Sequence, residues 1–493
     1  MRPTRSGRQG PSLTPESEIS RFARRPRSDA RSIGKQAARR TDGDPLSDQA
    51  FTRRASYGPG SPTIGARGAK TRQQIIDAAL LCFTEKGFHA TAVEDITAVA
   101  ETSRATLYQY FESKDAIFIE LMDESGGALS RVTRRLGRLG PTAEGYDNLH
   151  WWLGEWSWVF DRYAATFVEW ANVNSPRAPL RPKLAQFVNF HTEHFGRTLQ
   201  AAGYAGTETS PVSILVLAVT SRFHYIRHVY RPGLTETQLL DSLATAVQLL
   251  LFPNTPAAVL AAGPKTAASR DQRSPGRPPM PDIGPLATLP PRDSIVDPTP
   301  FEDVSPQAAH TVRQLLDAAG RVFAAHGYDA TNIDLIVTEA ALARGTFYRY
   351  FSDKFELIAA LAHEAGSVMC PLFEEFESVV ATRDGARLRE WLRRFLAAQR
   401  LYLGVTRAWT EGLPVDPVLL SPAADVVRAM GHAITATFGP SRPYPLDRRA
   451  VGMLLSGLLE HFPNEGVGSS YEPTDDQIIE AQALFIERVL LPN

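Results

Sequence analysis

The chain has 493 residues, of which 43% are hydrophobic and 22% charged, a composition typical of a globular protein with more than one domain. Its formal net charge of −1 does not indicate a nucleic-acid partner, so any DNA-binding surface has to be local. Its two cysteines, Cys82 and Cys370, are too few and too distant for a disulfide framework or a metal site, which fits a reducing, cytoplasmic setting.

Other classes of protein are also disfavoured by the sequence. It has no run of about eighteen apolar residues, so no membrane span is expected. The amino terminus is rich in arginine but lacks the apolar core of a secretory signal. We find no nucleophile elbow, phosphate-binding loop or metal-ligand cluster, so we expect neither an enzyme nor a cofactor.

Residues 1–69 are rich in Arg, Ser, Gly and Pro and have few large apolar side chains. Such a composition cannot bury enough surface to fold alone, so we expect a disordered basic arm. Two interpretations stay open. The arm could add phosphate contacts to DNA binding, or it could be a solvated tail that results from a start codon placed too far upstream.

Residues 70–118 have the pattern of a three-helix unit. A first helix over 70–86 carries an apolar stripe that includes Ile75, Ala79 and Phe83, and a short amphipathic helix follows over 93–100. Ser103 is a candidate N-cap for a further helix, whose inward face is expected to carry Leu107, Tyr108 and Phe111. Two short helices joined by a tight turn, the second rich in hydrogen-bonding side chains, describe a helix-turn-helix.

This stretch has a characteristic order of residues: Gly87-Phe88, Thr91, Ile96, Ala100, Thr106-Leu107-Tyr108, Tyr110-Phe111 and Lys114. It resembles the DNA-binding signature of the TetR family of bacterial repressors. The resemblance implies a DNA-binding head followed by a variable all-helical body, which usually dimerises and holds a small-molecule pocket.

The same pattern returns in the second half, at Gly327-Tyr328, Ala330-Thr331, Ile336, Ala340, Thr346-Phe347-Tyr348, Tyr350-Phe351 and Lys354. The offset is 354 − 114 = 240 residues and 327 − 87 = 240 residues, so no gap intervenes. Roughly a third of the positions are identical, which makes the unit an internal repeat. We therefore predict an all-α protein of two tandem TetR-like modules.

The predicted boundaries follow from composition and from this repeat. After the arm, we expect a first head at 70–118 and a first helical body at 119–253. A proline-rich linker at 254–305 should follow, and then a second head at 306–358 and a second helical body at 359–493.

Five of the seven tryptophans fall on a predicted helix over 145–172 of the first body. One interpretation is an aromatic wall that binds an apolar or aromatic effector, and the other is a bulky core or subunit interface. The candidate ligand-binding residues are Trp152, Trp156, Phe160, Tyr163 and Phe167. His224 and His228 share a helical face, but no nearby carboxylate completes a metal site, so we expect pocket or core histidines and no metal.

Arginine bonds guanine and glutamine bonds adenine in the major groove, so Arg104 and Gln109 are the best candidates for base contacts in the first head. Arg344 and Arg349 occupy the matching positions, and the difference between Gln109 and Arg349 predicts different base preferences. Further candidates for DNA binding are Thr91, Ser103, Thr106, Tyr108, Tyr110, Lys114, Thr331, Gly345, Thr346, Tyr348, Tyr350 and Lys354. For each hydroxyl the alternative is a helix cap or a hydrogen bond inside the head.

The turn departs from the Gly-Val-Ser of the resembled family. The first head has Glu101-Thr102-Ser103 and the second has Ala341-Leu342-Ala343. Loss of the turn glycine strains a position that favours positive φ, and Ala343 removes the N-cap hydroxyl.

These features together predict a cytoplasmic, nucleoid-associated and ligand-responsive transcriptional regulator, most simply a repressor. Its partners would be a double-stranded DNA operator and a small-molecule effector. Two heads could form an internal pseudo-dimer on an imperfect palindrome, or the full chain could form a homodimer with four heads. The alternative is a binding or scaffold protein with one active head and a degenerate second module that serves dimerisation.

Overall fold

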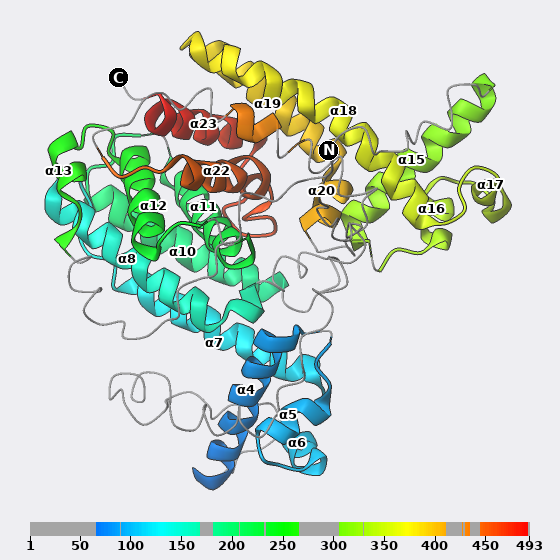
Figure 1. Ribbon diagram of the computed structural model, residues 1–493, viewed down its shortest axis with the longest axis horizontal. Coiled ribbons are helices and arrows are strands. Elements are labelled where there is room, and N and C mark those ends of the chain that lie inside the picture. Colours follow the sequence, from blue (N-terminus) through cyan, green and yellow to red (C-terminus); the bar gives the residue numbers. More distant parts are fainter. Residues whose placement is uncertain are drawn as a thin grey trace, which may run out of the picture. The chain divides into compact units, whose positions relative to one another are not determined.

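Every regular element that the structure describes is a helix (Figure 1). This computed structural model describes residues 66–88, 90–167, 181–206, 208–230, 233–265, 305–328, 330–410, 426, 429–433 and 444–491. No helix in these ranges is both long and apolar enough to cross a membrane. The described chain divides into two compact units, one ending at Ile117 and the other beginning at Phe118.

The first unit is the first head. It contains α4 (Ala66–Lys86), α5 (Val93–Val99), α6 (Arg104–Tyr110) and the start of α7 (Lys114–Arg134). The predicted stripe of α4 is buried, as are Ile96 of α5 and Leu107 of α6. Gly87 ends α4 with a φ of 82°, which only glycine adopts without strain. The helix begins four residues before the predicted 70, and the basic arm lies outside the described residues apart from this first turn.

The first body is a bundle of α7, α8 (Ala143–Arg162), α10 (Arg181–Ala201), α11 (Thr209–Tyr230) and α12 (Glu236–Leu251). Two polar pairs join α8 to α12: the Tyr146 hydroxyl lies 2.9 Å from that of Thr245 in the core, and His150 Nε2 lies 2.9 Å from the partly buried Asp241. A single helix over 145–172 was predicted, but α8 ends at Arg162 because Tyr163 leaves the helical conformation. Residues 168–180 lie outside the described part.

A short helix occupies the start of the range predicted as linker. This helix, α13 (Ala257–Ala262), lies within the predicted range 254–305, and its Leu260 is fully buried. It packs against α8, so this part of the range belongs to the first body. Residues 266–304 are outside the described ranges.

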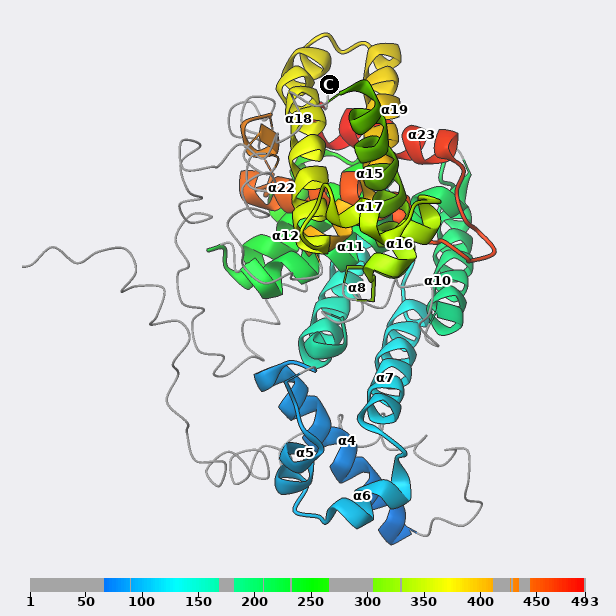
Figure 2. The same ribbon diagram turned by 90° about the vertical axis from the view of Figure 1, so that its right-hand side faces the viewer.

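The second head repeats the first with α15 (Pro306–His326), α16 (Ile333–Glu339) and α17 (Arg344–Tyr348) (Figure 2). Ser305 caps α15, and Pro306 takes the first helical position, where its missing N–H is not needed. The next helix, α18 (Lys354–Ala381), was expected to stop near Met369. It continues past Pro371 because Leu372, Phe373, Phe376 and Val379 are buried along its core face.

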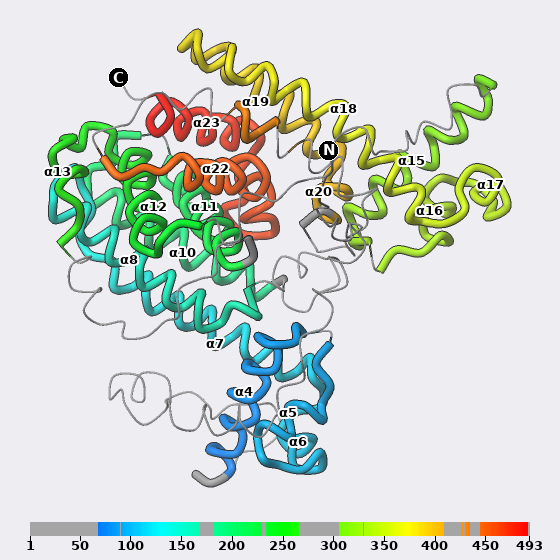
Figure 3. Tube along the Cα trace, viewed as in Figure 1, coloured from blue at the N-terminus to red at the C-terminus, as the bar shows by residue number. Residues whose placement is uncertain are grey.

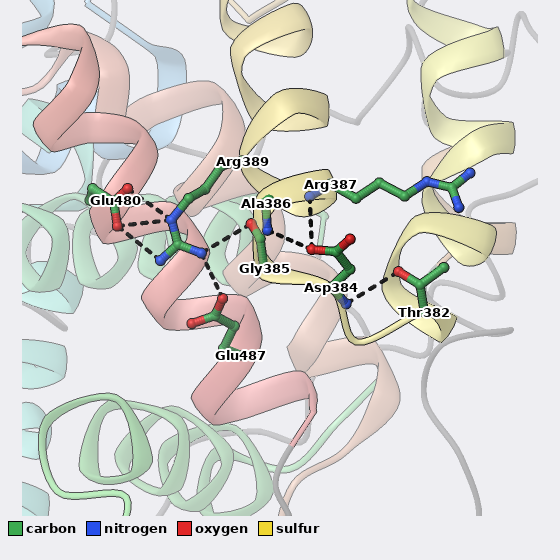
Figure 4. Close-up of polar contacts among 8 residues, drawn as sticks. All are labelled: Thr382, Asp384, Gly385, Ala386, Arg387, Arg389, Glu480 and Glu487. Carbon is green, nitrogen blue, oxygen red and sulfur yellow. Dashed lines mark hydrogen bonds and ion pairs between the residues drawn. The ribbon is translucent and has the colours of Figure 1, made fainter.

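The second body contains α19 (Gly385–Leu401), α20 (Leu403–Thr410), α22 (Arg448–Ser456) and α23 (Asp475–Phe485). Asp384 caps α19, and Arg389 of α19 forms ion pairs with Glu480 and Glu487 (Figure 4). These pairs tie α19 to α23 and to the π-helical turn η5 (Ile486–Leu490).

The second head is joined to its own body through α20. Gly404 approaches α15 so closely that a Cβ there would lie 2.7 Å from the Cβ of Phe323. Arg407 donates to the Ala324 carbonyl at 2.6 Å. On the other side, the Tyr402 hydroxyl donates to Glu364 at 2.7 Å, and Glu364 also accepts from Arg313 of α15 at 2.9 Å.

The two bodies pack against each other within the second unit. Helix α11 contacts α22, α23 and the π-helical turn η3 (Gly457–His461), while α12 contacts α22 and η5 (Figures 1 and 3). Residues 212–219 of α11 and 242–251 of α12 are buried on every face. A helix that is apolar and buried all round has a neighbour on each side. One side of each helix is covered by the first body and the other by the second.

Candidate nucleic-acid interface

In each head the second helix of the helix-turn-helix, α6 or α17, is the recognition helix. The turn before it has the strained backbone that the sequence predicted. Glu101 has a φ of 50° and Ala341 a φ of 54°, a left-handed conformation that disfavours residues with a Cβ. The caps differ between the heads: Ser103 Oγ accepts from the Thr106 N–H at 3.0 Å, whereas Ala343 offers no side-chain cap. Correspondingly, α17 ends at Tyr348, two positions before the equivalent end of α6.

Both predicted base-reading arginines are exposed at the first position of the recognition helix. The side chain of Arg104 is 59% exposed and that of Arg344 is 56% exposed. Gln109 and Arg349 are exposed as well. All four candidates for base contacts therefore lie on the outer surface of the heads.

Tyr108 was expected on the inward face of the recognition helix, and this was wrong. Tyr108 is 46% exposed and Tyr348 is 49% exposed, while Leu107 and Phe347 fill the core position beside them. Leu107 and Tyr108 are adjacent and both bulky, and two adjacent residues of a short helix cannot both face inward. The sequence did not show which of the two would face the core. Thr106, Tyr110, Thr346 and Tyr350 are partly buried, and Gly345 is exposed with open space beside it.

The threonines that precede the turn point into the heads. The Thr91 hydroxyl donates to the Gly87 carbonyl, and the Thr331 hydroxyl to the Gly327 carbonyl, each at 2.7 Å. Both residues are buried. Their positions favour the structural alternative over the predicted contact with a DNA backbone.

Lys114 and Lys354 have an equally internal arrangement. Lys114 Nζ donates to the carbonyls of Phe88 and Thr91 at 2.7 and 3.0 Å and lies 4.4 Å from the centre of the Phe88 ring. Lys354 repeats these contacts with Tyr328 and Thr331 at 2.8 and 3.0 Å. Each lysine thus fastens the start of the long helix to the loop that follows the first helix, which favours a positioning role over a direct phosphate contact.

A carboxylate beside each arginine was missed in the sequence. Arg104 forms an ion pair with Glu94 at 2.5 Å, and Arg344 forms one with Asp334 at 2.7 Å. A signal was present, because Glu94 and Asp334 stand at equivalent positions of the repeat, ten residues before their arginines. Whether opposite charges ten residues apart form an ion pair depends on the geometry of the turn between them, which the sequence alone does not give.

The predicted effector residues all belong to the buried core of the first body. Three of them, Trp156, Phe160 and Phe167, also line a cleft within the second compact unit, whereas Trp152 and Tyr163 do not. The remaining lining residues come from both bodies: Leu129, Phe187, Ser221, Arg222, Tyr225, His461 and Glu465. The lining of the cleft therefore combines aromatic and polar side chains.

His224 lies behind this aromatic wall. Its ring stacks on Trp156 with centroids 5.8 Å apart and lies 5.6 Å from that of Phe160. Burial lowers the pKa of His224 well below its usual range, so the ring is neutral. Neither of its ring nitrogens, nor Trp156 Nε1, has a hydrogen-bond partner among the described residues. No group of three or more potential metal ligands occurs in the described ranges, and His224 faces aromatic rings.

Comparison with known proteins identifies the heads. The model of the family of bacterial regulatory proteins named tetR matches the chain twice, at residues 75–121 and 315–361. The chain is 37% identical over 61 residues to the HTH-type transcriptional repressor DhaR of Mycobacterium sp. (strain GP1), a match covering 12% of this chain and 31% of that protein. It is 36% identical over 56 residues to the probable acrEF/envCD operon repressor of Escherichia coli (strain K12), covering 11% and 26%.

A third relative is the A-factor receptor protein of Streptomyces griseus, which is 37% identical over 59 residues, 12% of this chain and 21% of that protein. The chain thus spans no more than about a third of the length of these relatives. Each family match begins within the first helix of one head and runs through the two short helices into the first turns of the helix that follows. The chain therefore carries two domains that match the model of the tetR family of bacterial regulatory proteins, one in each half.

Proposed function

We propose that this protein is a ligand-responsive transcriptional regulator that represses by occupying an operator with both of its heads. The observation that carries the proposal is the repetition of an exposed arginine at the first position of each recognition helix. An α-helix fits the major groove, and arginine at its start can bond a guanine edge bidentately. We place the protein in the cytoplasm, associated with the nucleoid.

Burial on all faces of α11 and α12 supports an internal pseudo-dimer. The surfaces that two copies would need for pairing through these helices are already covered by α22, α23, η3 and η5 of the same chain. One chain would then present two heads to two neighbouring half-sites. A homodimer of full chains, with four heads, would need a different surface.

The two heads would read different half-sites. Gln109 favours adenine and Arg349 favours guanine at the corresponding position. An operator for one chain should therefore be an imperfect palindrome, and its asymmetry should follow the orientation of the chain.

The cleft beside Trp156 and Phe160 supports a response to an apolar or aromatic effector. Such pockets are mostly apolar with a few polar groups, which matches an aromatic lining that also includes Arg222, His461 and Glu465. An effector with a higher affinity for one arrangement of the bodies than for another would favour that arrangement. The accompanying shift of α7 or α18, the helices that follow the two heads, would change the spacing of the heads. The difference in affinity between the two arrangements sets the size of the response.

Selection of bound fragments from genomic DNA, followed by gel-shift titration of Arg104→Ala and Arg344→Ala, tests the proposal. Each substitution should weaken binding to the selected operator about 5- to 150-fold, because each removes one base contact worth about 1–3 kcal/mol. Absence of any enriched sequence, or full affinity in both variants, would overturn it.

A second candidate function has one active head. It is favoured by the uncapped and shorter α17, which makes the second recognition helix less stable than the first. In this case, Arg104→Ala would abolish specific binding, while Arg344→Ala would leave it unchanged.

A further inference from the structure

The same three-residue cluster occurs on the outer face of both heads. It consists of the second residue of the helix before the turn, the first residue of the recognition helix and a tyrosine one helical turn later. In the first head these are Glu94, Arg104 and Tyr108, and in the second they are Asp334, Arg344 and Tyr348. The carboxylate changes length between the heads but keeps its charge.

The arginine is held from two sides in each cluster. Arg344 Nη1 donates to both Asp334 oxygens at 2.7 and 2.9 Å, and Nη2 lies 3.4 Å from the Tyr348 hydroxyl. In the first head, Arg104 bonds Glu94 at 2.5 Å. The pKa of Arg104 is raised by the Tyr108 hydroxyl first and by Glu94 second, so the tyrosine lies close there too.

A carboxylate on this face is unexpected for DNA binding alone. It lies where a polyanion approaches, so it weakens the attraction that every phosphate contact supplies. Its retention in both heads needs a reason that outweighs this repulsion. Exposed ion pairs contribute little to folding stability, so stability is a weak reason.

Orientation of the guanidinium is a sufficient reason. Arginine has five N–H donors in a planar fork, and a carboxylate bonded to Nη1 leaves others available. A fork that is fixed before binding loses less side-chain freedom when it meets a guanine edge. The same carboxylate repels a phosphate that would otherwise capture the arginine without reading sequence.

We propose that Glu94 and Asp334 are specificity-determining positioning residues, which hold Arg104 and Arg344 for base recognition and disfavour their capture by phosphate. This inference rests on the proposed function, since it assumes that the heads read DNA. The two acidic residues should therefore increase the preference for one DNA sequence over another while they lower the affinity for DNA as a whole.

A purely structural role makes a different prediction. An acidic residue in the first turn of α5 or α16 interacts favourably with the positive end of the helix. Its loss would then lower thermal stability and weaken binding to every DNA equally.

The test measures binding of the full chain to the selected operator, to the operator with the contacted guanine replaced, and to unrelated DNA, each over a series of salt concentrations. Discrimination is the ratio of the affinity for the operator to the affinity for the operator with the contacted guanine replaced. We expect Asp334→Asn and Glu94→Gln to reduce this ratio about threefold to tenfold. A bidentate arginine–guanine pair supplies roughly 5- to 150-fold, so these variants should lose only a part of it. We expect affinity for unrelated DNA to rise, and log K to fall more steeply with log salt by up to about one unit.

Matched control variants distinguish the effect of a carboxylate beside the arginine from the effect of removing a negative charge anywhere in the head. Glu339→Gln, also on α16, breaks the 2.6 Å ion pair with Arg321, and Glu85→Gln removes an exposed carboxylate from α4. Both remove one negative charge from a head and should leave discrimination unchanged. Asp334→Glu and Glu94→Asp keep the charge and should restore most of the discrimination.

The outcomes distinguish this inference from the function on which it rests. If Arg104→Ala and Arg344→Ala weaken specific binding but Glu94→Gln and Asp334→Asn keep full discrimination, the positioning role is wrong and the function stands. Equal losses on all three DNAs, with a lowered melting temperature, would also overturn it in favour of a structural role. If the arginine substitutions have no effect, the proposed function itself fails.

Discussion

Ser103 and Ala343 occupy the same position of two matching turns, and only the serine closes its helix with a side-chain hydrogen bond. A missing N-cap costs a helix about 1 kcal/mol. For recognition helices of a single turn or two, this difference is large enough to decide how well each is ordered before it meets DNA.

We expect Ala343→Ser to stabilise α17 by about 1 kcal/mol and Ser103→Ala to destabilise α6 by a similar amount. Hydrogen exchange measured on peptides that contain residues 344–350 and 104–110 gives the readout. Ala343→Ser should slow exchange in the first peptide, and Ser103→Ala should speed it in the second. Unchanged rates in both would show that the cap does not limit helix opening.

Buried histidines make the stability of the second unit depend on pH. Burial lowers the pKa of His191 to about 4, and that of His224 lies well below its ordinary value of 6.5. Below pH 6.5 the unfolded chain binds protons that the folded chain refuses, so stability is lost as pH falls from 6.5 towards the folded pKa. His191 alone should lower the free energy of unfolding by about 2 kcal/mol between pH 6.5 and pH 5.

Denaturant titrations of the full chain at pH 7, 6 and 5 measure this slope. His191→Phe and His224→Phe replace each ring with one that cannot be protonated, so each variant should lose less stability than the parent over the same range. Parallel pH profiles for parent and variants would contradict the assignment of neutral, buried rings.

At the scale of helices, the approach of the two bodies depends on one glycine. A Cβ at Gly457 would lie 2.9 Å from the Val219 Cα, so the backbone of α11 occupies the space a side chain would need. Nearby, Arg222 of α11 bonds Ser456 at 3.3 Å and Glu460 at 3.4 Å. The Gln482 side chain donates to the Leu458 carbonyl at 2.9 Å, which satisfies a group in the π-helical turn.

We expect Gly457→Ala to destabilise the second unit by about 1–3 kcal/mol, because the helices must separate to admit the methyl group. Gly126→Ala on α7 is the control, since a Cβ there meets nothing within 4 Å. Alanine has a higher helix propensity than glycine, so that change should be neutral or stabilising by up to about 1 kcal/mol. Equal effects in denaturant titrations would contradict a close crossing at Gly457.

Much of this arrangement was predictable from local patterns. The apolar stripe of α4, the cap at Ser103 and the start of α15 at Pro306 each depend on a few adjacent residues. The strained turn was also predicted, because Glu101 and Ala341 replace a glycine.

What the sequence could not supply depends on distant contacts. The extension of α18 past Pro371 is stabilised by burial of its core face, and Leu260 holds α13 within the predicted linker. The inward turn of Lys114 and the pairing of Glu94 with Arg104 need the relative positions of two elements. The cleft combines residues more than 300 positions apart, such as Trp156 and His461, so no local pattern could reveal it.

At the scale of the whole molecule, we propose that one chain does what pairs of chains do in dimeric helix-turn-helix proteins. The helices that would pair two copies are covered within the chain: α11 and α12 lie against α22, α23 and the two π-helical turns. Because both heads lie on one chain, their ratio is one to one. If the heads pair within the chain, as we propose, their pairing would not depend on protein concentration.

The mass of the complex between the full chain and its selected operator tests this claim most directly. Native mass spectrometry or sedimentation at several protein concentrations should give one chain per operator, with free protein as a monomer. In this complex, cleavage protection should cover two unlike half-sites about one helical turn apart. Two chains on one operator at the lowest concentration that gives binding would contradict an internal pseudo-dimer.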